Sequence, residues 1–337
     1  MFLSFLGCRG STPVSDPECA RYGGATSCVA VWPGAADDPW PHLVLDAGTG
    51  FVNLEHVLGD APFVGTVLLT HLHWDHTHGL PFLRQAGMPG HRLRLVVPGQ
   101  GADPEEVMNR AFSPPHFPVP IAMLGANWSF DGIEPGTYDV EGFEVRAAEI
   151  PHKGSRTFGY RVDDGESSFA YLPDHMPLGA GTGPEGLGEY HQAALALAAG
   201  VDLLVHDAQH TASELEEKAF LGHSAAEYVV GLGVAAGARA VALFHHDPHR
   251  TDAQLDELVD ALGSRAPLPV LAAHEGMVLA LGAAAGAGAG AGGSRGLSVG
   301  GTAGGQGRVP APVPREVGDA KWGPPRATEE GPPGPGA

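Results

Sequence analysis

The segment with the clearest chemical meaning is Thr-His-Leu-His-Trp-Asp-His, residues 70–76. It places four metal-type ligands in six positions, namely His71, His73, Asp75 and His76. Imidazole and carboxylate groups suit zinc, manganese or iron. The apolar residues 67–69 come directly before, so the cluster starts where a buried strand would end, and functional groups collect at such ends. A histidine-rich surface patch is the alternative, but the spacing favours a metal site.

Three more groups of polar residues follow apolar runs. His152 comes after residues 147–150, Asp174 and His175 come after 169–172, and a run of histidines from residue 245 to 249 comes after 240–244. A single histidine at a strand end is usually structural. Four such groups in one chain predict a shared site, and a carboxylate is the natural bridge between two metal ions.

These groups must be positioned by a framework of alternating strands and helices. Strands are expected at residues 2–6, 27–31, 43–45, 66–69, 93–97, 143–150, 158–162, 168–172, 203–206, 240–244, 270–271 and 277–281. One helix is expected at 190–199, ended by Gly200, and another after a capping box of Thr251 and Gln254. Ser224 with Glu227 predicts a second capping box ahead of residues 228–236. The alternation indicates layered sheets with helices outside.

Composition limits the class of protein. The chain has 337 residues and 43% hydrophobic content, which is ample for a core. It has no apolar run long enough for a transmembrane helix, and its N-terminus lacks the features of a signal peptide. Its three cysteines are an odd number, so we interpret them as free thiols. We therefore expect a cytoplasmic protein with no membrane partner.

Charge and local composition divide the chain and restrict its partners. The net charge of −20 repels phosphate backbones, so long nucleic acid is a poor candidate substrate, although bound metal ions would invert the local field.

Composition changes at about residue 283, where a Gly/Ala/Pro-rich stretch begins. We predict a folded domain at 1–282 and a disordered tail at 283–337.

Residues 1–282 resemble the metallo-β-lactamase-fold superfamily, and within it the ribonuclease Z-like and small phosphodiesterase branch. Besides the histidine cluster, three motifs carry the resemblance: the N-terminal segment 7–29, Asp-Ala-Gly at 46–48, and Gly-His-Ser at 222–224. The resemblance implies an α+β fold, a four-layer αββα sandwich.

The resemblance also implies a ligand set for two divalent metal ions, zinc in the first place, with manganese or iron as alternatives. One ion would be bound by His71, His73 and His152, the other by Asp75, His76 and His245, with Asp174 bridging them. His245 is preferred to His246 because it directly follows the apolar run, as in the family pattern. Asp46 resembles the carboxylate that orients a ligand histidine; its alternative is a simple turn residue.

Departures from the family narrow the expected activity. Aspartate at position 174, in place of the cysteine of true β-lactamases, disfavours antibiotic hydrolysis. His73, in place of the glutamate of flavin-linked di-iron relatives, disfavours electron transfer. No insertion resembles the tRNA-gripping arm of ribonuclease Z. The resemblance thus implies a hydrolase of a small phosphodiester, such as a cyclic nucleotide, that uses a metal-bridging hydroxide.

Asp75 and His223 are the expected catalytic residues. Asp75 would orient the hydroxide or accept its proton, and His223 would bind the phosphate or protonate the leaving oxygen. For His223 the alternative is packing at a helix N-terminus.

Three other functions stay open. The same centre could hydrolyse a lactone, thioester or other carboxylic ester. A mononuclear iron dioxygenase is disfavoured by the full set of seven ligands, and a non-enzymatic binding module is disfavoured because no ligand is missing. Whether the protein forms a homodimer is left open.

Overall fold

Two β-sheets face each other at the centre of the computed structural model, which describes residues 1–33, 39–125, 127–282 and 298–300. The first sheet has the order β15-β14-β1-β2-β3-β4-β5-β6, and the second has the order β13-β12-β11-β10-β9-β8-β7. Strands β3 to β6 are parallel, as are β10 to β13. Parallel neighbours carry their C-terminal ends to one edge of a sheet, where loops can share a site.

The strand bounds are as follows. The first sheet contains β1 (Phe2–Gly7), β2 (Cys28–Trp32), β3 (Leu43–Leu45), β4 (Val64–Leu68), β5 (Arg92–Pro98), β6 (Trp128–Ile133), β14 (Val278–Ala280) and β15 (Ser298–Gly300). The second contains β7 (Gly136–Val140), β8 (Phe143–Ile150), β9 (Thr157–Asp163), β10 (Ser168–Leu172), β11 (Leu203–Asp207), β12 (Val241–Phe244) and β13 (Val270–Ala272).

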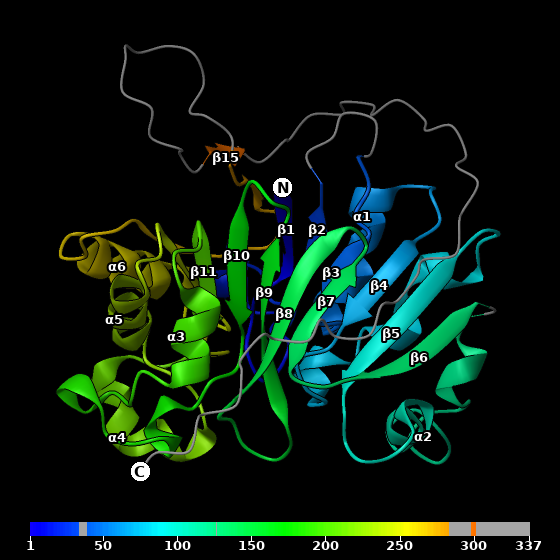
Figure 1. Ribbon diagram of the computed structural model, residues 1–337, viewed down its shortest axis with the longest axis horizontal. Coiled ribbons are helices and arrows are strands. Elements are labelled where there is room, and N and C mark those ends of the chain that lie inside the picture. Colours follow the sequence, from blue (N-terminus) through cyan, green and yellow to red (C-terminus); the bar gives the residue numbers. More distant parts are fainter. Residues whose placement is uncertain (34–38, 126, 283–297, 301–337) are drawn as a thin grey trace, which may run out of the picture.

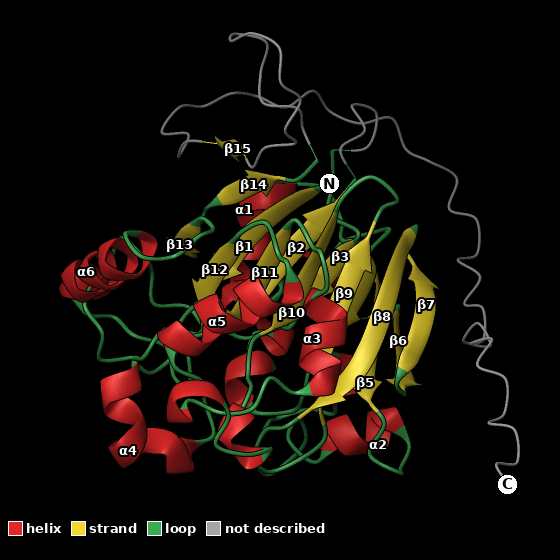
Figure 2. Ribbon diagram, turned by 60° about the vertical axis from the view of Figure 1, so that its left-hand side comes forward, coloured by secondary structure: helices red, strands yellow, loops and turns green. Residues whose placement is uncertain are grey.

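Helices cover the outer faces of both sheets (Figure 2). On the first sheet lie α1 (Leu54–Leu58) and α2 (Pro104–Asn109); on the second lie α3 (Gln192–Ala198), α4 (Leu215–Lys218), α5 (Ala226–Ala236) and α6 (Asp252–Gly263). One buried cluster fills the space between the sheets, where the Phe5 and Phe244 rings lie 6.0 Å apart. Two further clusters lie beneath the helices. The predicted four-layer αββα sandwich is therefore confirmed.

The helix signals had mixed outcomes. The Thr251–Gln254 capping box is present at the start of α6. The box expected from Ser224 and Glu227 is wrong, since α5 begins after Ala225 without a side-chain cap. The Ser224 hydroxyl donates instead to the His175 carbonyl, 2.8 Å away. A long-range hydrogen bond has taken the side chain that a local capping pattern would use.

Most expected strands form within one or two residues of their predicted bounds, whereas β6 and β7 were not expected. The predicted tail lies outside the described residues except for 298–300, which form β15 and pair with β14. Its disorder stays a prediction. No helix in the described part of the chain is long and apolar enough to cross a membrane.

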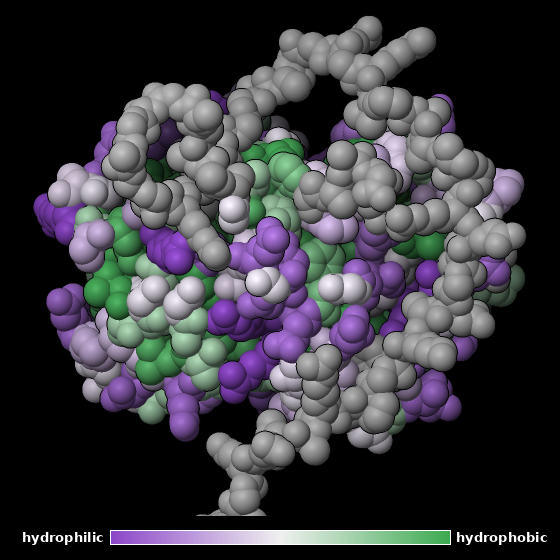
Figure 3. All heavy atoms as spheres, turned by 45° about the horizontal axis from the view of Figure 1, so that its top comes forward, coloured by the Kyte–Doolittle hydropathy of each residue, from purple (hydrophilic) through white to green (hydrophobic). Residues whose placement is uncertain are grey.

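The strands before the metal-type ligands end at a common edge. Strands β8 and β10 are both antiparallel to β9, so they run in the same direction, and β12 is linked to β10 through parallel β11. In Figure 1 this is the lower edge, away from the N-terminus, where β1 begins. Figure 3 shows the molecule from between the front and the top of Figure 1, and hydrophilic residues lie across the middle of the part that is coloured.

A buried arginine fastens the loop after β1 to this edge. Arg9 is fully buried, and its guanidinium donates to the carbonyls of Gly23, Asp247 and Arg250 at 2.9–3.1 Å. Because a buried charge needs its donors satisfied, these bonds tie the loops after β1 and β12 together. The backbone N–H of Ser11 consequently reaches the Asp75 carboxylate at 2.9 Å.

Candidate metal centre

The structure brings the seven expected ligand residues together in two groups. Within each group the ligand atoms lie within 4.8 Å of one another. The first group is His71, His73, His152 and Asp174; the second is Asp75, His76, Asp174 and His245. The groups match the two ligand sets that the family resemblance implies, and Asp174 belongs to both.

Asp174 lies between the groups with one carboxylate oxygen toward each. Its Oδ2 is 3.6 Å from His71 Nε2 and 3.3 Å from His152 Nε2. Its Oδ1 is 2.9 Å from His76 Nε2 and 3.2 Å from His245 Nε2. The fully buried β10 and the chain turn after it hold the carboxylate in place. A carboxylate shared in this way is suited to bridge two cations.

Hydrogen bonds on the outer side of the rings select the tautomer that a metal needs. Nδ1 of His152 donates to the Gly222 carbonyl at 2.9 Å, and Nδ1 of His71 lies 3.1 Å from the Thr70 hydroxyl. Nδ1 of His76 donates to Asp46 at 2.8 Å. In each ring the lone pair is thereby left on Nε2, which points into the centre.

Buried atoms without partners test whether divalent ions fit here. His71 Nε2, His76 Nε2 and Asp174 Oδ1 are buried and point into the centre without a well-directed hydrogen bond, although His76 Nε2 and Asp174 Oδ1 lie 2.9 Å apart. Burial lowers the pKa of His71 well below its usual value, so the ring is neutral, as a ligand must be. Burial alone would raise the pKa of Asp75, but His76 and His245 lower it, so the carboxylate is ionised. Burial alone would lower the pKa of His76, but the carboxylates of Asp174, Asp75 and Asp46 raise it, so this ring must lose a proton when it binds a metal ion. The neutral His71 ring, the ionised carboxylates and the buried atoms that point into the centre together fit divalent metal ions.

Asp46 accepts hydrogen bonds that orient residues of this centre. Its carboxylate accepts hydrogen bonds from Thr70 N–H (2.7 Å), the Thr70 hydroxyl (2.9 Å), the Tyr171 hydroxyl (3.0 Å) and His76 Nδ1 (2.8 Å). It is therefore more than a turn residue. Thr70, which follows β4, and Tyr171, in β10, were missed from the sequence because a hydroxyl gives no local signal of its partner.

Backbone strain is concentrated at the centre. Five described non-glycine residues have positive φ, and three of them are Ser11, Asp46 and His245, with φ of 57–58°. The left-handed conformation is unfavourable for residues with a Cβ atom and persists where the surrounding structure imposes it. Here it turns the chain sharply after a strand, so that His245 presents its ring to the centre.

His223 lies beside the metal groups and is held by Asp207. Its Nδ1 donates to Asp207 Oδ2 at 3.0 Å, and its ring stacks 4.9 Å from that of His245. Burial disfavours the charged ring, but the Asp207 carboxylate outweighs burial and raises the pKa of His223 to about 9. Packing is thus not the whole role of His223. Asp207 was missed, although it is the last residue of β11 and follows the apolar run 203–205 with only His206 between, so the strand-end signal applied to it equally.

The structure distinguishes His245 from His246. The His245 ring lies in the second group, whereas His246 donates through Nε2 to the Ala273 carbonyl at 2.8 Å.

Two basic residues near the centre differ in their ion pairs. Arg156 pairs with Glu134 and Glu149, whereas Lys153, the residue after His152, is exposed.

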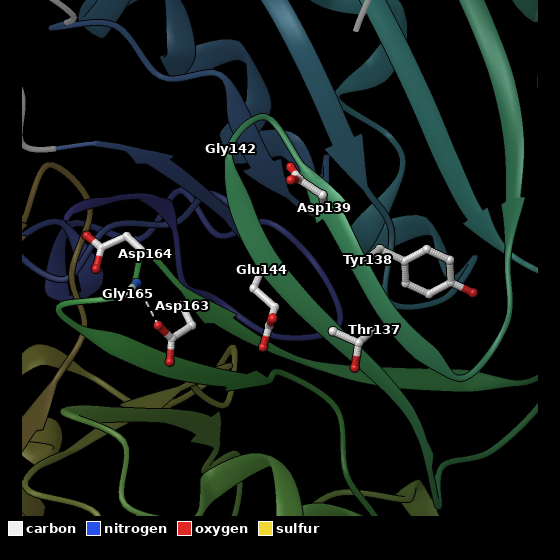
Figure 4. Close-up of a pocket in the computed structure, with 8 residues that line it drawn as sticks. All are labelled: Thr137, Tyr138, Asp139, Gly142, Glu144, Asp163, Asp164 and Gly165. Atoms are coloured by element: carbon white, nitrogen blue, oxygen red, sulfur yellow. Dashed lines mark hydrogen bonds between the residues drawn. The ribbon is translucent and has the colours of Figure 1, made fainter. Parts of the chain in front are cut away.

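A separate hollow lies at the other end of the second sheet (Figure 4). Its volume is about 190 Å³, and it is lined by Thr137, Tyr138, Asp139, Gly142, Glu144, Asp163, Asp164 and Gly165. It borders the start of β8, whereas His152 follows the end of β8, so the two places are roughly 24 Å apart along an eight-residue strand. Asp164 there pairs with the N-terminal amine at 3.0 Å, a structural role.

The three cysteines are free and buried, in agreement with the prediction of free thiols. Burial raises the pKa of Cys8 and of Cys28, which disfavours the reactive thiolate.

Comparisons with known proteins extend over most of the chain. Residues 41–246 match the family described as Beta-lactamase superfamily domain. Ribonuclease Z of Haloarcula marismortui is 25% identical over 318 residues, covering 82% of this chain and 96% of that protein. Among solved structures, the metallo-β-lactamase-fold protein YhfI from Bacillus subtilis has a TM-score of 0.61 at 18% identity, covering 82% of this chain and 98% of its own. A diphosphatase from the PhnP family has a TM-score of 0.58 at 19% identity, covering 82% and 96%.

Proposed function

The chain belongs to the β-lactamase superfamily and is a metal-dependent hydrolase, and from that premise we propose that it cleaves a small phosphodiester, such as a cyclic nucleotide. The observation that carries the proposal is the Asp207–His223 pair beside the bridging Asp174, with 3.9 Å between His223 Nδ1 and Asp174 Oδ2. A proton donor at this place suits a leaving oxygen that departs from phosphorus.

The chain's own residues divide the work. His71, His73, His152 and Asp174 would hold one ion, and Asp75, His76, Asp174 and His245 the other. When bound, two such ions supply a nucleophile at neutral pH and neutralise charge on the phosphoryl oxygens. Zinc is the ion that this donor set fits first, with manganese or iron as alternatives.

Asp75 would accept a proton during nucleophilic attack, and His223 would donate one to the leaving group. Asp75 Oδ2 accepts from the Ser11 N–H and lies 3.1 Å from His245 Nε2, so the carboxylate is fixed in orientation and can accept a proton from the attacking water. His223, with Nδ1 bound to Asp207, presents Nε2 as the donor to the leaving oxygen.

The size of the substrate is inferred from charge. The net charge of −20 opposes a long phosphate backbone, whose binding depends on many lysine and arginine contacts. Relatives named ribonuclease Z and diphosphatase support chemistry at phosphorus. We place the reaction in the cytoplasm because the three cysteines are free thiols.

The test is a panel of bis-p-nitrophenyl phosphate, cyclic nucleotides, lactones and thioesters, with metal-analysed full-length protein. The Asp75→Ala variant should lose turnover. The control is His249→Ala, which replaces an exposed histidine in the histidine-rich segment 245–249 and should leave turnover unchanged. Turnover of lactones or thioesters without phosphodiesters would replace the proposal by carbonyl ester hydrolysis.

His223→Ala gives a sharper second test. Loss of a general acid costs roughly 10²–10⁴-fold when the leaving group needs a proton. The variant should lose that much on a cyclic nucleotide, whose leaving group is an alkoxide, and much less on bis-p-nitrophenyl phosphate, whose phenolate leaves unprotonated. Equal losses on both substrates would assign His223 to a structural role.

A further inference from the structure

We propose that Trp74 and Phe220 bind an aromatic ester group of the phosphodiester substrate, such as a nucleobase, at the mouth of the metal centre. The inference rests on the proposed phosphodiesterase function and names the substrate class for that site.

Trp74 is the first observation. It lies between two candidate ligands, His73 and Asp75, in the 3₁₀ helix Trp74–His76, and it is 69% exposed. Its one ring contact among the described residues is a stack on His78, also exposed, at 5.3 Å and 19°. A large indole held in water beside a metal centre contributes little to folding, because its apolar surface is not buried.

Phe220 is the second observation, from a different part of the chain. It is 66% exposed in the 3₁₀ helix Ala219–Leu221, which ends at Gly222. The Gly222 carbonyl accepts the hydrogen bond from His152 Nδ1 at 2.9 Å. The ring is therefore placed only two residues from a backbone group that orients a candidate ligand.

Sequence neighbours of both aromatic residues contact the same histidine, His152. The His152 ring lies 5.1 Å from that of His73, the residue before Trp74, and the Gly222 contact leads from His152 to Phe220. Of the six large apolar side chains that are exposed in the described residues, Trp74, Phe220 and Leu221 lie within three positions of a centre residue or of His223. Half of these exposed side chains thus belong to the segments that carry the centre, where a bound ligand would cover them.

Charge at the mouth favours a phosphate ester over a neutral aromatic compound. Lys153, which follows His152, places Nζ 5.8 Å from the centre of the Phe220 ring. It supplies a local positive charge in a strongly acidic protein. With an aromatic group stacked on Trp74 and Phe220, the phosphate would lie between the Lys153 ammonium and the two groups of candidate metal ligands. Its negative charge would be attracted there by Lys153 and by bound cations.

Stacking of a base on an aromatic side chain contributes roughly five- to a hundredfold in affinity. The enzyme should therefore prefer aromatic over alkyl esters. A second copy of this chain is the competing occupant, since tryptophan and phenylalanine are enriched at protein interfaces.

The experiment uses two matched pairs on the metal-loaded full chain. Bis-p-nitrophenyl phosphate and methyl p-nitrophenyl phosphate share a leaving group and differ by one aromatic ring. Adenosine 5′-monophosphate and ribose 5-phosphate differ only in the base, and calorimetry measures their binding without turnover. Wild type should favour the aromatic member of each pair by about tenfold. Trp74→Ala should reduce both preferences several-fold, Trp74→Phe should retain them, and Phe220→Ala should weaken them.

The control is Val234→Ala, another exposed apolar side chain, on α5, which should change neither preference. If wild type hydrolyses methyl p-nitrophenyl phosphate but shows no aromatic preference, or if Trp74→Ala keeps it, only this inference is overturned. No phosphodiester turnover at all would overturn the proposed function and this inference with it. A dimer that Trp74→Ala converts to monomer, with selectivity unchanged, would assign the indole to a subunit interface.

Discussion

Replacing Asp46 with asparagine should weaken one of the two metal sites and leave the other intact. Asparagine keeps the side-chain volume and tolerates the left-handed backbone at this position, where φ is 58°. All groups that contact the carboxylate are donors, including His76 Nδ1 at 2.8 Å and the Tyr171 hydroxyl at 3.0 Å. An amide nitrogen in place of one oxygen cannot accept from them.

The expected magnitude follows from the tautomer of His76. Facing an amide N–H, the ring must move its proton from Nδ1 to Nε2, the atom that lies 2.9 Å from Asp174 Oδ1 and would bind metal. Loss of such an orienting carboxylate typically costs 10- to 100-fold in metal affinity, which corresponds to about 1.4–2.8 kcal/mol. The first group should be unaffected, because His152 Nδ1 keeps the Gly222 carbonyl and His71 Nδ1 keeps the Thr70 hydroxyl, which can still donate to the oxygen of asparagine.

Metal titration against a chromophoric chelator, with native mass spectrometry for stoichiometry, measures this effect. Asp46→Asn should bind one equivalent with wild-type affinity and the second at least tenfold more weakly. Tyr160→Phe is the matched control: it removes an equally buried hydroxyl, bound to the Leu69 carbonyl at 2.7 Å, and should cost stability without changing metal affinity. Two equivalents bound normally by Asp46→Asn would refute the tautomer argument.

Two further predictions concern the loop that carries Phe220. Burial alone would raise the pKa of Glu214, but the Thr211 N–H and Arg250 lower it from 4.5 to about 2. The folded pKa lies below the unfolded one, so ionised Glu214 stabilises the fold above about pH 4.5, and this contribution is lost as the pH falls toward 2. In urea unfolding, Glu214→Gln should be less stable than wild type at pH 7, and the gap should narrow between about pH 5 and pH 3. The exposed control Glu216→Gln should show no such convergence, and a gap independent of pH would contradict the assignment. Gly222→Ala should cost about 1–2 kcal/mol of unfolding free energy, because φ is 95° and the new Cβ would lie 3.1 Å from the Lys153 side chain. Gly263→Ala, where a Cβ meets nothing within 4 Å, should be neutral or slightly stabilising, and equal costs for the two would contradict the backbone argument.

The residues of the candidate metal centre could be found in the sequence because two signals agree at each position, and the family resemblance then implied how they divide between two ions. One is chemical, since histidine and aspartate bind divalent ions, and the other is positional, since each follows an apolar run that must be a buried strand. Both signals survive folding because strand direction carries the residues after β4, β8, β10 and β12 to one place. The same reasoning would have found Asp207 at the end of β11 had it been applied there.

Other parts could not be predicted because their information is not local. The edge strands β6 and β7 have mixed burial, so their sequences lack a clean alternation. The Ser224 hydroxyl could cap a helix or bond to a distant carbonyl, and only the folded chain shows that His175 receives it. The exposure of a side chain is likewise a property of the fold. From the sequence alone, Trp74 is an apolar residue beside the histidines, and only the structure shows that it is exposed.

The arrangement of supports suggests why this centre tolerates so much buried polarity. Asp46 and Asp207 are each fully buried, and each orients one histidine, His76 and His223 respectively. Buried carboxylates are costly unless every oxygen is paired, and Asp46 is paired with donors from Thr70 and Tyr171 as well. Hydrogen bonds therefore pair the polar atoms around the centre, whereas His71 Nε2, His76 Nε2 and Asp174 Oδ1 point into it without a well-directed hydrogen bond. A fold that needed these residues only for packing would have no reason to bury three polar atoms in this way.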